Sequence, residues 1–142
     1  MKVLVTGAKG FVGKNLVVML RQLQGMEIID YDMDSPADLL DHGLATADLV
    51  FHLAGVNRPE KPEDYAAGNT GFTKVISDRL RSLGRKPTII FTSSIQAELD
   101  NLYGVSKRGA EEEILNFSKT TGTPAVIFRM KNIFGKWCRP NY

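Results

Sequence analysis

The stretch that most constrains the fold of this chain is residues 3–13, which read VLVTGAKGFVG. Three apolar residues typical of a short buried strand lead to Gly7, Gly10 and Gly13, and the apolar spacing of a helix follows. A glycine-rich turn between strand and helix presents backbone N–H groups and the positive end of the helix dipole to an anion. Glycine allows the sharp turn, the close approach of backbone to a pyrophosphate and tight helix–strand packing. This turn therefore predicts a dinucleotide-binding site.

A second stretch places a tyrosine and a lysine on one face of a helix. Tyr103 and Lys107 are four residues apart, a spacing that brings helical side chains together. A lysine ammonium at that distance stabilises a tyrosinate, so the phenol can exchange a proton with an alcohol or a carbonyl. Upstream, residues 88–94 are typical of a buried strand that ends in hydroxyls, and Ser94 can hydrogen-bond the same substrate oxygen. We predict Ser94, Tyr103 and Lys107 as catalytic residues.

Apolar runs alternate with helical patterns along the chain. Five runs are typical of buried strands: residues 3–5, 28–29, 49–53, 89–91 and 125–128. Helical spacing of apolar residues recurs at Val12, Leu16, Leu20 and Leu23, up to Gly25, then at Phe72, Val75, Ile76, Leu80 and Leu83, and again at Val105, Ala110, Ile114 and Phe117. A further short helix fits residues 38–46. This alternation predicts an α/β fold with a parallel sheet.

We expect one Rossmann-like, doubly wound parallel sheet of about five strands. Residues 34–47 leave room for the short helix but not for the usual third strand, so the expected order is 2-1-4-5-6 in Rossmann numbering. Residues 129–142 are similar to the start of a substrate loop. We therefore predict that residues 1–142 are an NAD(P)-binding domain truncated before a substrate lobe. Such truncation would expose an apolar face and favour a homodimer through the helices near 64–83 and 104–119.

The composition limits the classes of partner. The chain is 43% hydrophobic and 24% charged, as globular domains are, and no apolar run approaches the ~20 residues of a membrane span. A net charge of +2 is too small to favour nucleic acid or an anionic membrane. Cys138 is the single cysteine, which excludes an internal disulfide and fits a reducing compartment. We expect a cytoplasmic protein that binds neither nucleic acid nor membrane.

Several positions near the carboxyl ends of the strands are candidates for cofactor contacts. With the three glycines, the predicted set comprises Phe11, Val12, Asp30, Asp32, Leu53, Ala54, Gly55, Asn69, Thr92, Tyr103 and Lys107. Asp30 and Asp32 close the second strand, where a carboxylate accepts hydrogen bonds from ribose hydroxyls. A 2′-phosphate instead requires Arg or Lys, and residues 31–34 contain neither. This favours NAD(H), while Lys9 or Arg58 leaves NADP(H) open.

Two polar residues lie in apolar or helical surroundings. His52 is in an apolar strand, and we interpret it as a core or near-cofactor histidine. No second His, Cys or acid lies near it at metal-ligand spacing, so we expect no metal. Asn69 lies in a helical stretch, where asparagine has poor propensity. We expect Asn69 to bridge backbone strands or to hold a water near the active site.

These motifs resemble those of the extended short-chain dehydrogenase/reductase superfamily, in particular its NAD(P)-dependent epimerase/dehydratase group acting on nucleotide sugars. The resemblance covers essentially the whole chain and rests on residues 6–13, 52–55, 69–71, 92–94, 103–107 and 129–132. Residues 52–60, 93–97 and 134–142 are similar to the N-terminal reductase domain of bifunctional capsular polysaccharide enzymes. In that group this domain reduces a UDP-4-keto-6-deoxy-hexosamine at C4 with NADPH, and a C-terminal cupin domain carries out the preceding epimerisation.

The resemblance implies the same reduction in the synthesis of a capsule or O-antigen sugar precursor. Tyr103 would donate the proton, Lys107 would hold the nicotinamide ribose and Ser94 would polarise the carbonyl. The related 4,6-dehydratases carry an Asp-Glu pair where this chain has Ser93 and Ser94, which disfavours dehydration. The nine positions from Ser94 to Tyr103 are fewer than in typical UDP-galactose 4-epimerases. A UDP-sugar 4-epimerase and a non-catalytic dinucleotide-binding protein are the alternatives.

The resemblance also implies substrate contacts after the last strand. Arg129 and Asn132 would fix the substrate loop, although an ion pair at the sheet edge is an equal interpretation for Arg129. Lys136 and Arg139 would meet the diphosphate of a UDP-sugar. Ser94 belongs to this predicted substrate set as well.

Overall fold

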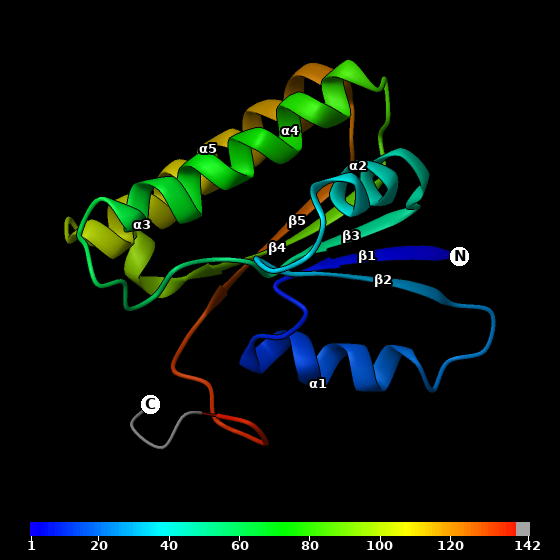
Figure 1. Cartoon of the computed structure of the whole chain (residues 1–142). Coiled ribbons are helices and arrows are strands. Elements are labelled where there is room, and N and C mark those ends of the chain that lie inside the picture. Colours follow the sequence, from blue (N-terminus) through cyan, green and yellow to red (C-terminus); the bar gives the residue numbers. More distant parts are fainter. Residues whose placement is uncertain (139–142) are drawn as a thin grey trace.

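One parallel sheet of five strands forms the centre of the computed structural model, which describes residues 1–138. Its strands are β1 Lys2–Thr6, β2 Glu27–Tyr31, β3 Leu49–His52, β4 Thr88–Ser94 and β5 Ala125–Met130. They lie side by side in the order β2-β1-β3-β4-β5 (Figure 1). Each predicted apolar run is a strand, and the order is that of a Rossmann sheet without its third strand. The predicted fold class and strand order are confirmed.

Helices cover both faces of this sheet. In the described chain they are α1 Phe11–Leu20, α2 Ala37–Thr46, α3 Asp64–Ala66, α4 Phe72–Ser82 and α5 Leu102–Thr121, with a π-helical turn at Ala67–Gly71 and a 3-10 turn at Ile95–Glu98. α1 lies on one face, and α2, α4 and α5 lie on the other (Figure 1). The predicted short helix is α2. Within residues 1–138 no helix is both long and apolar enough to cross a membrane.

The sheet buries a separate core on each face. On the side of α2, α4 and α5 the buried residues include Leu4, Val50, Ile89, Phe91, Leu40, Leu44, Ile76, Leu80, Ile114 and Phe117. On the side of α1 they are Val3, Val5, Ala8, Val17 and Leu20. Successive strand residues point to opposite faces. A strand buried on both faces therefore reads as a continuous apolar run, which is why the runs of the central strands β1, β3 and β4 were recognisable.

The end of α1 differs from the prediction. The helix stops at Leu20 instead of reaching Gly25, and Leu23 is 52% exposed. Residues 21–25 form the connection to β2, where the guanidinium of Arg21 pairs with the Asp30 carboxylate at 2.6 Å. Leu23 follows the helical spacing without belonging to the helix.

The buried faces of α4 and α5 also differ in part from the predicted apolar faces. Three residues of those faces are exposed by 41–46%: Val75, Leu83 and Val105. On α4 the buried positions include Thr73, which bonds His52, and Ser77, which bonds Glu113. Hydrophobic periodicity does not detect such positions, because their burial depends on hydrogen-bond partners from other elements.

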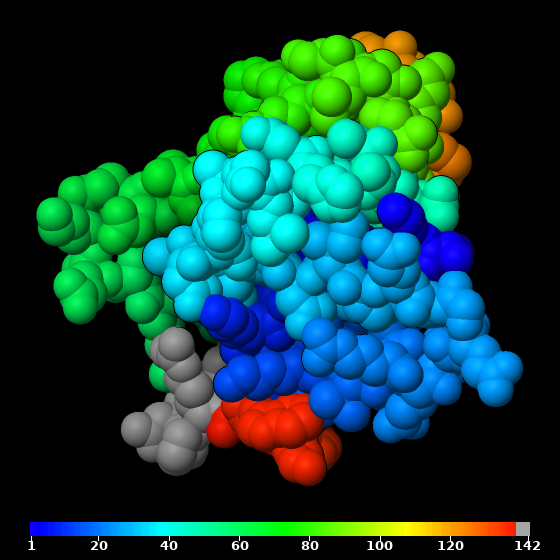
Figure 2. All heavy atoms as spheres, turned by 45° about the vertical axis from the view of Figure 1, so that its right-hand side comes forward, coloured from blue at the N-terminus to red at the C-terminus, as the bar shows by residue number. Residues whose placement is uncertain are grey.

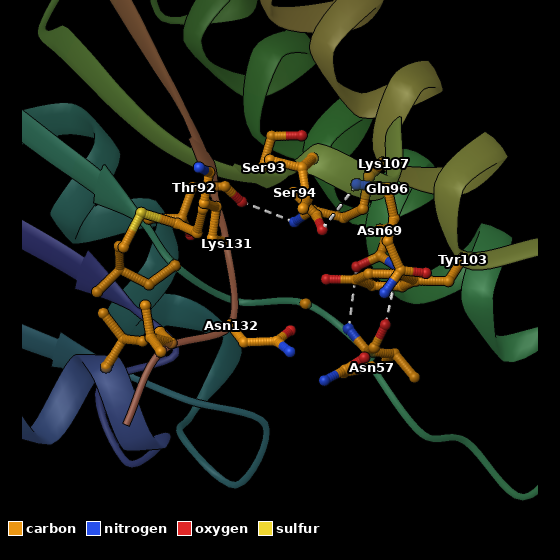
Figure 3. Close-up of a pocket in the computed structure, with 17 residues that line it drawn as sticks. Asn57, Asn69, Thr92, Ser93, Ser94, Gln96, Tyr103, Lys107, Lys131 and Asn132 are labelled. Atoms are coloured by element: carbon orange, nitrogen blue, oxygen red, sulfur yellow. Dashed lines mark hydrogen bonds between the residues drawn. The ribbon is translucent and has the colours of Figure 1, made fainter. Parts of the chain in front are cut away.

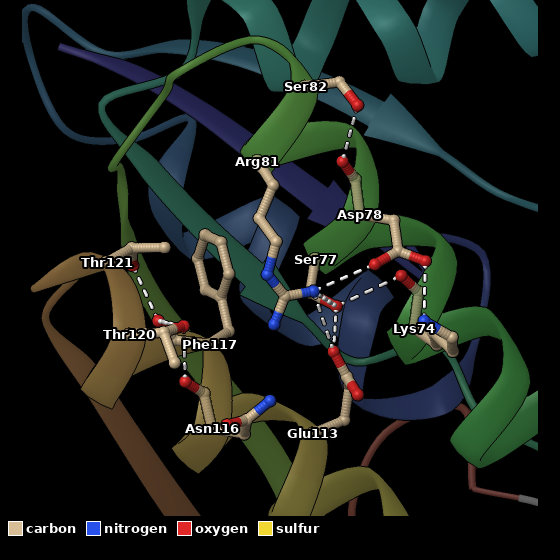
Figure 4. A network of polar contacts seen from close by, with 10 residues as sticks. All are labelled: Lys74, Ser77, Asp78, Arg81, Ser82, Glu113, Asn116, Phe117, Thr120 and Thr121. Atoms are coloured by element: carbon tan, nitrogen blue, oxygen red, sulfur yellow. Dashed lines mark hydrogen bonds and ion pairs between the residues drawn. The ribbon is translucent and has the colours of Figure 1, made fainter.

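A polar network joins α4 to α5 (Figure 4). The hydroxyl of Ser77 donates to the carboxylate of Glu113. The Arg81 guanidinium lies 5.2 Å from the Phe117 ring centroid, with its Nη1 3.2 Å from Glu113 and 2.9 Å from Asp78. These contacts hold α5, the helix that carries Tyr103 and Lys107, against α4.

The segment after β5 returns to α1. Figure 2 shows it, in red, against the blue surface of the first helix. The Asn15 side chain donates to the Lys136 carbonyl at 2.8 Å, and Gly135 lies beside the Phe11 ring. The start of the predicted substrate loop therefore passes the glycine turn.

Candidate active site

Two of the three glycines in the turn, Gly7 and Gly13, leave no room for a side chain. Gly7 has a φ of +73°, and a Cβ there would lie 2.7 Å from the Ala54 nitrogen. A Cβ on Gly13 would lie 2.1 Å from the Gly7 carbonyl oxygen. α1 begins directly after Gly10, with no side chain capping its first N–H groups. This tight, uncapped helix start matches what a pyrophosphate requires, so the residues present fit a dinucleotide.

A pocket beside the turn is lined by only one of the two predicted aspartates. It is lined by Gly7, Gly10, Tyr31, Asp32, Met33, Leu53, Ala54, Gly55 and Val56, among others. Asp32 follows the end of β2 and accepts hydrogen bonds from the N–H groups of Lys9 (2.7 Å) and Met33 (2.8 Å). Asp30 instead pairs with Arg21 and does not line this pocket. The structure thus brings Asp32, and not Asp30, to the predicted ribose position.

A neighbouring pocket collects the predicted catalytic residues (Figure 3). Ser94 at the end of β4, Tyr103 and Lys107 on α5, and Asn132 after β5 all line it, together with Val12, Gly55, Asn69 and Thr92. The Ser94 hydroxyl oxygen accepts a hydrogen bond from the Gln96 N–H at 3.1 Å. This bond uses an acceptor position of Ser94, so its hydroxyl hydrogen can still be donated to a substrate oxygen.

Lys107 is buried, with 5% of its surface exposed. Its Nζ donates to the Thr92 carbonyl at 2.7 Å and lies 4.5 Å from the Phe91 ring centroid. Burial lowers the pKa of Lys107 to about 8, against the opposing effect of the Glu111 charge. A lysine with such a pKa is still mostly protonated at neutral pH, so the ammonium can stabilise a tyrosinate or bond a hydroxyl.

The first turn of α5 holds Tyr103 in place. The Asn101 side chain caps the helix by accepting from the Gly104 N–H at 2.8 Å. The Ser106 hydroxyl donates to the Tyr103 carbonyl at 2.7 Å, and the Tyr65 ring lies 5.9 Å from the Tyr103 ring. Tyr65 was not predictable from the sequence, because α3 is too short to give a periodic signal.

Asn69 bridges backbone, as expected from its poor helix propensity. It lies in the π-helical turn, and its side-chain amide bonds both the N–H and the carbonyl of Val56, each at 2.9 Å. Its Nδ2 also donates to the Ser106 hydroxyl at 2.9 Å. Asn69 thus ties the loop after β3 to the start of α5. It bridges backbone as expected, but it joins a loop to a helix and not two strands, and a cofactor contact of Asn69 stays a prediction.

His52 is a satisfied core histidine. Its Nδ1 is 2.8 Å from the Thr6 hydroxyl and its Nε2 is 2.9 Å from the Thr73 hydroxyl. Thr73 donates its own hydrogen to the Asn69 carbonyl, so the proton of the imidazole is on Nε2. Burial, and next the charge of Lys107, lower the pKa of His52 to about 3. In the described chain, no group of three His, Cys, Asp or Glu residues is arranged for a metal ion.

The residues after β4 and β5 give mixed outcomes. The ion-pair interpretation of Arg129 is confirmed: its guanidinium bonds Glu111 through two nitrogens and Glu98 through a third. Asn132 reaches the catalytic pocket. The Lys136 ammonium lies 4.8 Å from the Trp137 ring centroid, and Arg139 is outside the described residues. The substrate contacts of these residues stay predictions.

Comparison with known proteins assigns this arrangement to a family. The model of the NAD dependent epimerase/dehydratase family matches residues 3–142. The chain belongs to this family. This match confirms the resemblance inferred from the sequence motifs. The predicted enzyme class, the NAD(P)-dependent nucleotide-sugar reductase/epimerase family, is confirmed as well.

Relatives within and near the family are considerably longer. A UDP-2-acetamido-2,6-beta-L-arabino-hexul-4-ose reductase of Pseudomonas aeruginosa is 50% identical over 142 residues, which are 100% of this chain and 38% of the relative. Among solved structures, the capsular polysaccharide assembling protein CapF from Staphylococcus aureus matches with a TM-score of 0.86 and 41% identity, over 100% of this chain and 38% of that one. RMD from Pseudomonas aeruginosa, complexed with NADPH, matches with a TM-score of 0.74 and 26% identity, over 93% and 55% of the two chains.

Proposed function

We propose that residues 1–142 form the cofactor-binding and catalytic domain of an NAD(P)H-dependent reductase that acts on the C4 ketone of a UDP-4-keto-6-deoxy-hexosamine. The observation that carries this proposal is the convergence of Ser94, Tyr103 and Lys107 in one pocket next to the glycine turn. The 50% identity to a 4-ketohexose nucleotide reductase supports the substrate class. The chain spans 38% of the length of that relative. We therefore propose that the substrate-binding lobe lies outside residues 1–142.

The chemistry that the cofactor supplies when bound is hydride transfer to the ketone carbon. The residues of this chain would handle the developing oxyanion. Ser94 donates a hydrogen bond to the carbonyl oxygen, and Tyr103 transfers its phenolic proton to the same oxygen. Lys107, held by the Thr92 carbonyl, stabilises the resulting tyrosinate and bonds the nicotinamide ribose.

The nucleotide preference follows from the pocket at the end of β2. Asp32 would accept from the adenosine ribose hydroxyls, and a carboxylate there opposes a 2′-phosphate. The ammonium of Lys9 is paired with Asp34. These contacts favour NADH. Because one relative binds NADPH, NADPH is the second candidate cofactor.

The test is Tyr103→Phe in the full-length protein. Removing the hydroxyl removes the proposed proton donor, so kcat should fall by ~10²–10⁴-fold. The ring still packs on Tyr65, so cofactor affinity should change only a few-fold. The assay follows oxidation of NAD(P)H with a UDP-4-keto sugar. Near wild-type turnover in Tyr103→Phe would contradict the mechanism. An epimerase returns the hydride to its substrate, so conversion without net loss of NAD(P)H would favour that alternative.

The proposal includes a homodimer through α4 and α5 and a cytoplasmic location. Val75 on α4 and Val105 on α5 are exposed apolar residues on this side of the molecule. The single cysteine and the proposed use of reduced cofactor suit a reducing compartment.

A further inference from the structure

A buried carboxylate lies one helical turn beyond Lys107. Glu111 is four residues after Lys107 and eight after Tyr103, so the three side chains follow one face of α5. Glu111 is only 5% exposed. A buried carboxylate is strongly destabilising unless it is paired and hydrogen-bonded, and the proposed proton transfer assigns no role to Glu111.

Arg129 keeps Glu111 ionised. The guanidinium of Arg129 bonds both carboxylate oxygens, with Nε at 2.9 Å from Oε1 and Nη2 at 2.7 Å from Oε2, while Nη1 bonds Glu98 at 2.9 Å. Burial by itself would raise the pKa of the Glu111 carboxyl. The hydrogen bonds of Arg129, the Ser93 hydroxyl, and the charges of Arg129 and Lys107 outweigh that effect and leave this pKa below its ordinary value.

The charges around Lys107 differ from element to element. β4 presents the Thr92 carbonyl and the Phe91 ring, which carry no net charge. β3 presents His52, which is neutral above pH 3 because of its burial. α5 presents Tyr103 and Glu111, and the β5 residue Arg129 is directed at Glu111. Among the described residues, Glu111 is therefore the anion placed to act on the Lys107 ammonium, because both side chains are buried and lie one turn apart on α5.

We propose that Glu111 is a positioning residue for proton transfer: its buried charge keeps Lys107 protonated beside Tyr103 and the cofactor ribose. The inference rests on the proposed function, since it assigns no chemistry of its own to Glu111. It explains why an ammonium that is desolvated by the sheet retains its charge in the working pH range. Arg129 then acts indirectly, by holding the carboxylate against β5.

The experiment replaces the charge and measures Lys107 directly. In Glu111→Gln, the Lys107 titration midpoint, followed by NMR of ¹³Cε-labelled lysine, should fall by about 1 pH unit. The signal is assigned with Lys107→Arg. In the full-length protein the alkaline limb of the kcat profile should move to lower pH by the same amount. The kcat at pH 6.5 and the KM for the cofactor should change less than about threefold.

The matched control is Glu113→Gln on the same helix, where the carboxylate pairs with Arg81 instead. Neither the titration midpoint nor the kcat profile should move. Glu111→Asp keeps the charge and should restore most of the wild-type profile, which also covers the case in which Glu111→Gln does not fold.

Three outcomes would overturn the inference: an unchanged Lys107 midpoint in folded Glu111→Gln, a shift of similar size in Glu113→Gln, or a shifted midpoint with an unmoved kcat limb. A wild-type rate in Tyr103→Phe would instead remove the proposed function. The two failures are therefore distinguishable.

Discussion

Lys107 is the residue at which stability and the proposed chemistry oppose each other. Its ammonium is held in the sheet by one carbonyl and one ring face. A pKa lowered from 10.5 to about 8 corresponds to roughly 3 kcal/mol of destabilisation of the charged form. The folded protein carries this cost at neutral pH, where the proposed chemistry uses the charge in the pocket.

Lys107→Met should therefore stabilise the fold while it abolishes turnover. At pH 7 we expect a gain of about 1–2 kcal/mol in the free energy of unfolding, since the lost contact to Thr92 offsets part of the relief. The cost is complete below pH 8 and disappears as pH rises from 8 to 10.5, because the unfolded lysine then also loses its proton. Urea denaturation at pH 7 and pH 10 measures this difference. Lys119→Met, at an exposed position of the same helix, is the control. An equal gain at both pH values would contradict the explanation.

The residues of the site were predictable in proportion to how local their signal is. Tyr103 and Lys107 share one helix, and Ser94 ends a recognisable strand, so spacing alone brings them together. Thr73 and Glu111 are buried by partners on other elements, and their spacing from Asn69 and Lys107 is the only trace in the sequence. Asp30 was expected at the ribose, but β2 ends at Tyr31 and only Asp32 turns toward the glycines.

At the scale of elements, the glycines of the turn between β1 and α1 have two separate roles, helix packing and access to the pocket. Gly13 packs the start of α1 on the turn after β1, where a Cβ would collide with the backbone of Gly7 and Ala8. A Cβ on Gly10 would lie 3.1 Å from the Gly7 carbonyl oxygen, and Gly10 lines the pocket that contains Asp32. Strands and helices here were predictable from apolar runs, whereas helix ends depended on contacts such as the Arg21–Asp30 pair.

Substitutions at these two glycines should separate folding from binding. Gly10→Val should leave a folded chain with no measurable NADH or NADPH binding in a fluorescence titration, because the branched side chain fills the pyrophosphate site. Gly13→Ala should lower the free energy of unfolding by several kcal/mol, in the range of overpacked cores. Circular dichroism melts distinguish the two. A folded Gly10→Val chain with unchanged affinity would remove the assignment of the cradle.

At the scale of the whole molecule, the two faces of the sheet are unequally covered. α1 covers the β1 and β2 side of its face, and Val126 and Phe128 of β5 are 44% and 51% exposed. On the other face, α4 and α5 are joined by the Arg81–Glu113 network. Topology was predictable because parallel strands require helical crossovers, whereas the apolar run of β5 gave no sign that Val126 and Phe128 are exposed.

The proposed α4–α5 dimer can be distinguished from association through β5. Val105→Glu places a charge on the outer side of α5 and should convert the 142-residue chain to a monomer in light scattering at high concentration. Phe128→Glu places the same charge on the other face of the sheet and should leave the dimer mass unchanged. A monomeric wild-type chain, or a dimer lost only in Phe128→Glu, would contradict the proposed interface.

The hydrogen bonds around His52 run in one direction from the Ala54 N–H through Thr6, His52 and Thr73 to the Asn69 carbonyl. None of these groups can reverse alone, because the acceptor of each bond is the donor of the next one. The loop predicted to receive the adenosine and the turn that supports Tyr103 are consequently ordered together when the chain folds. A ligand would meet a preorganised surface, so little of its binding energy would be lost to ordering the loops.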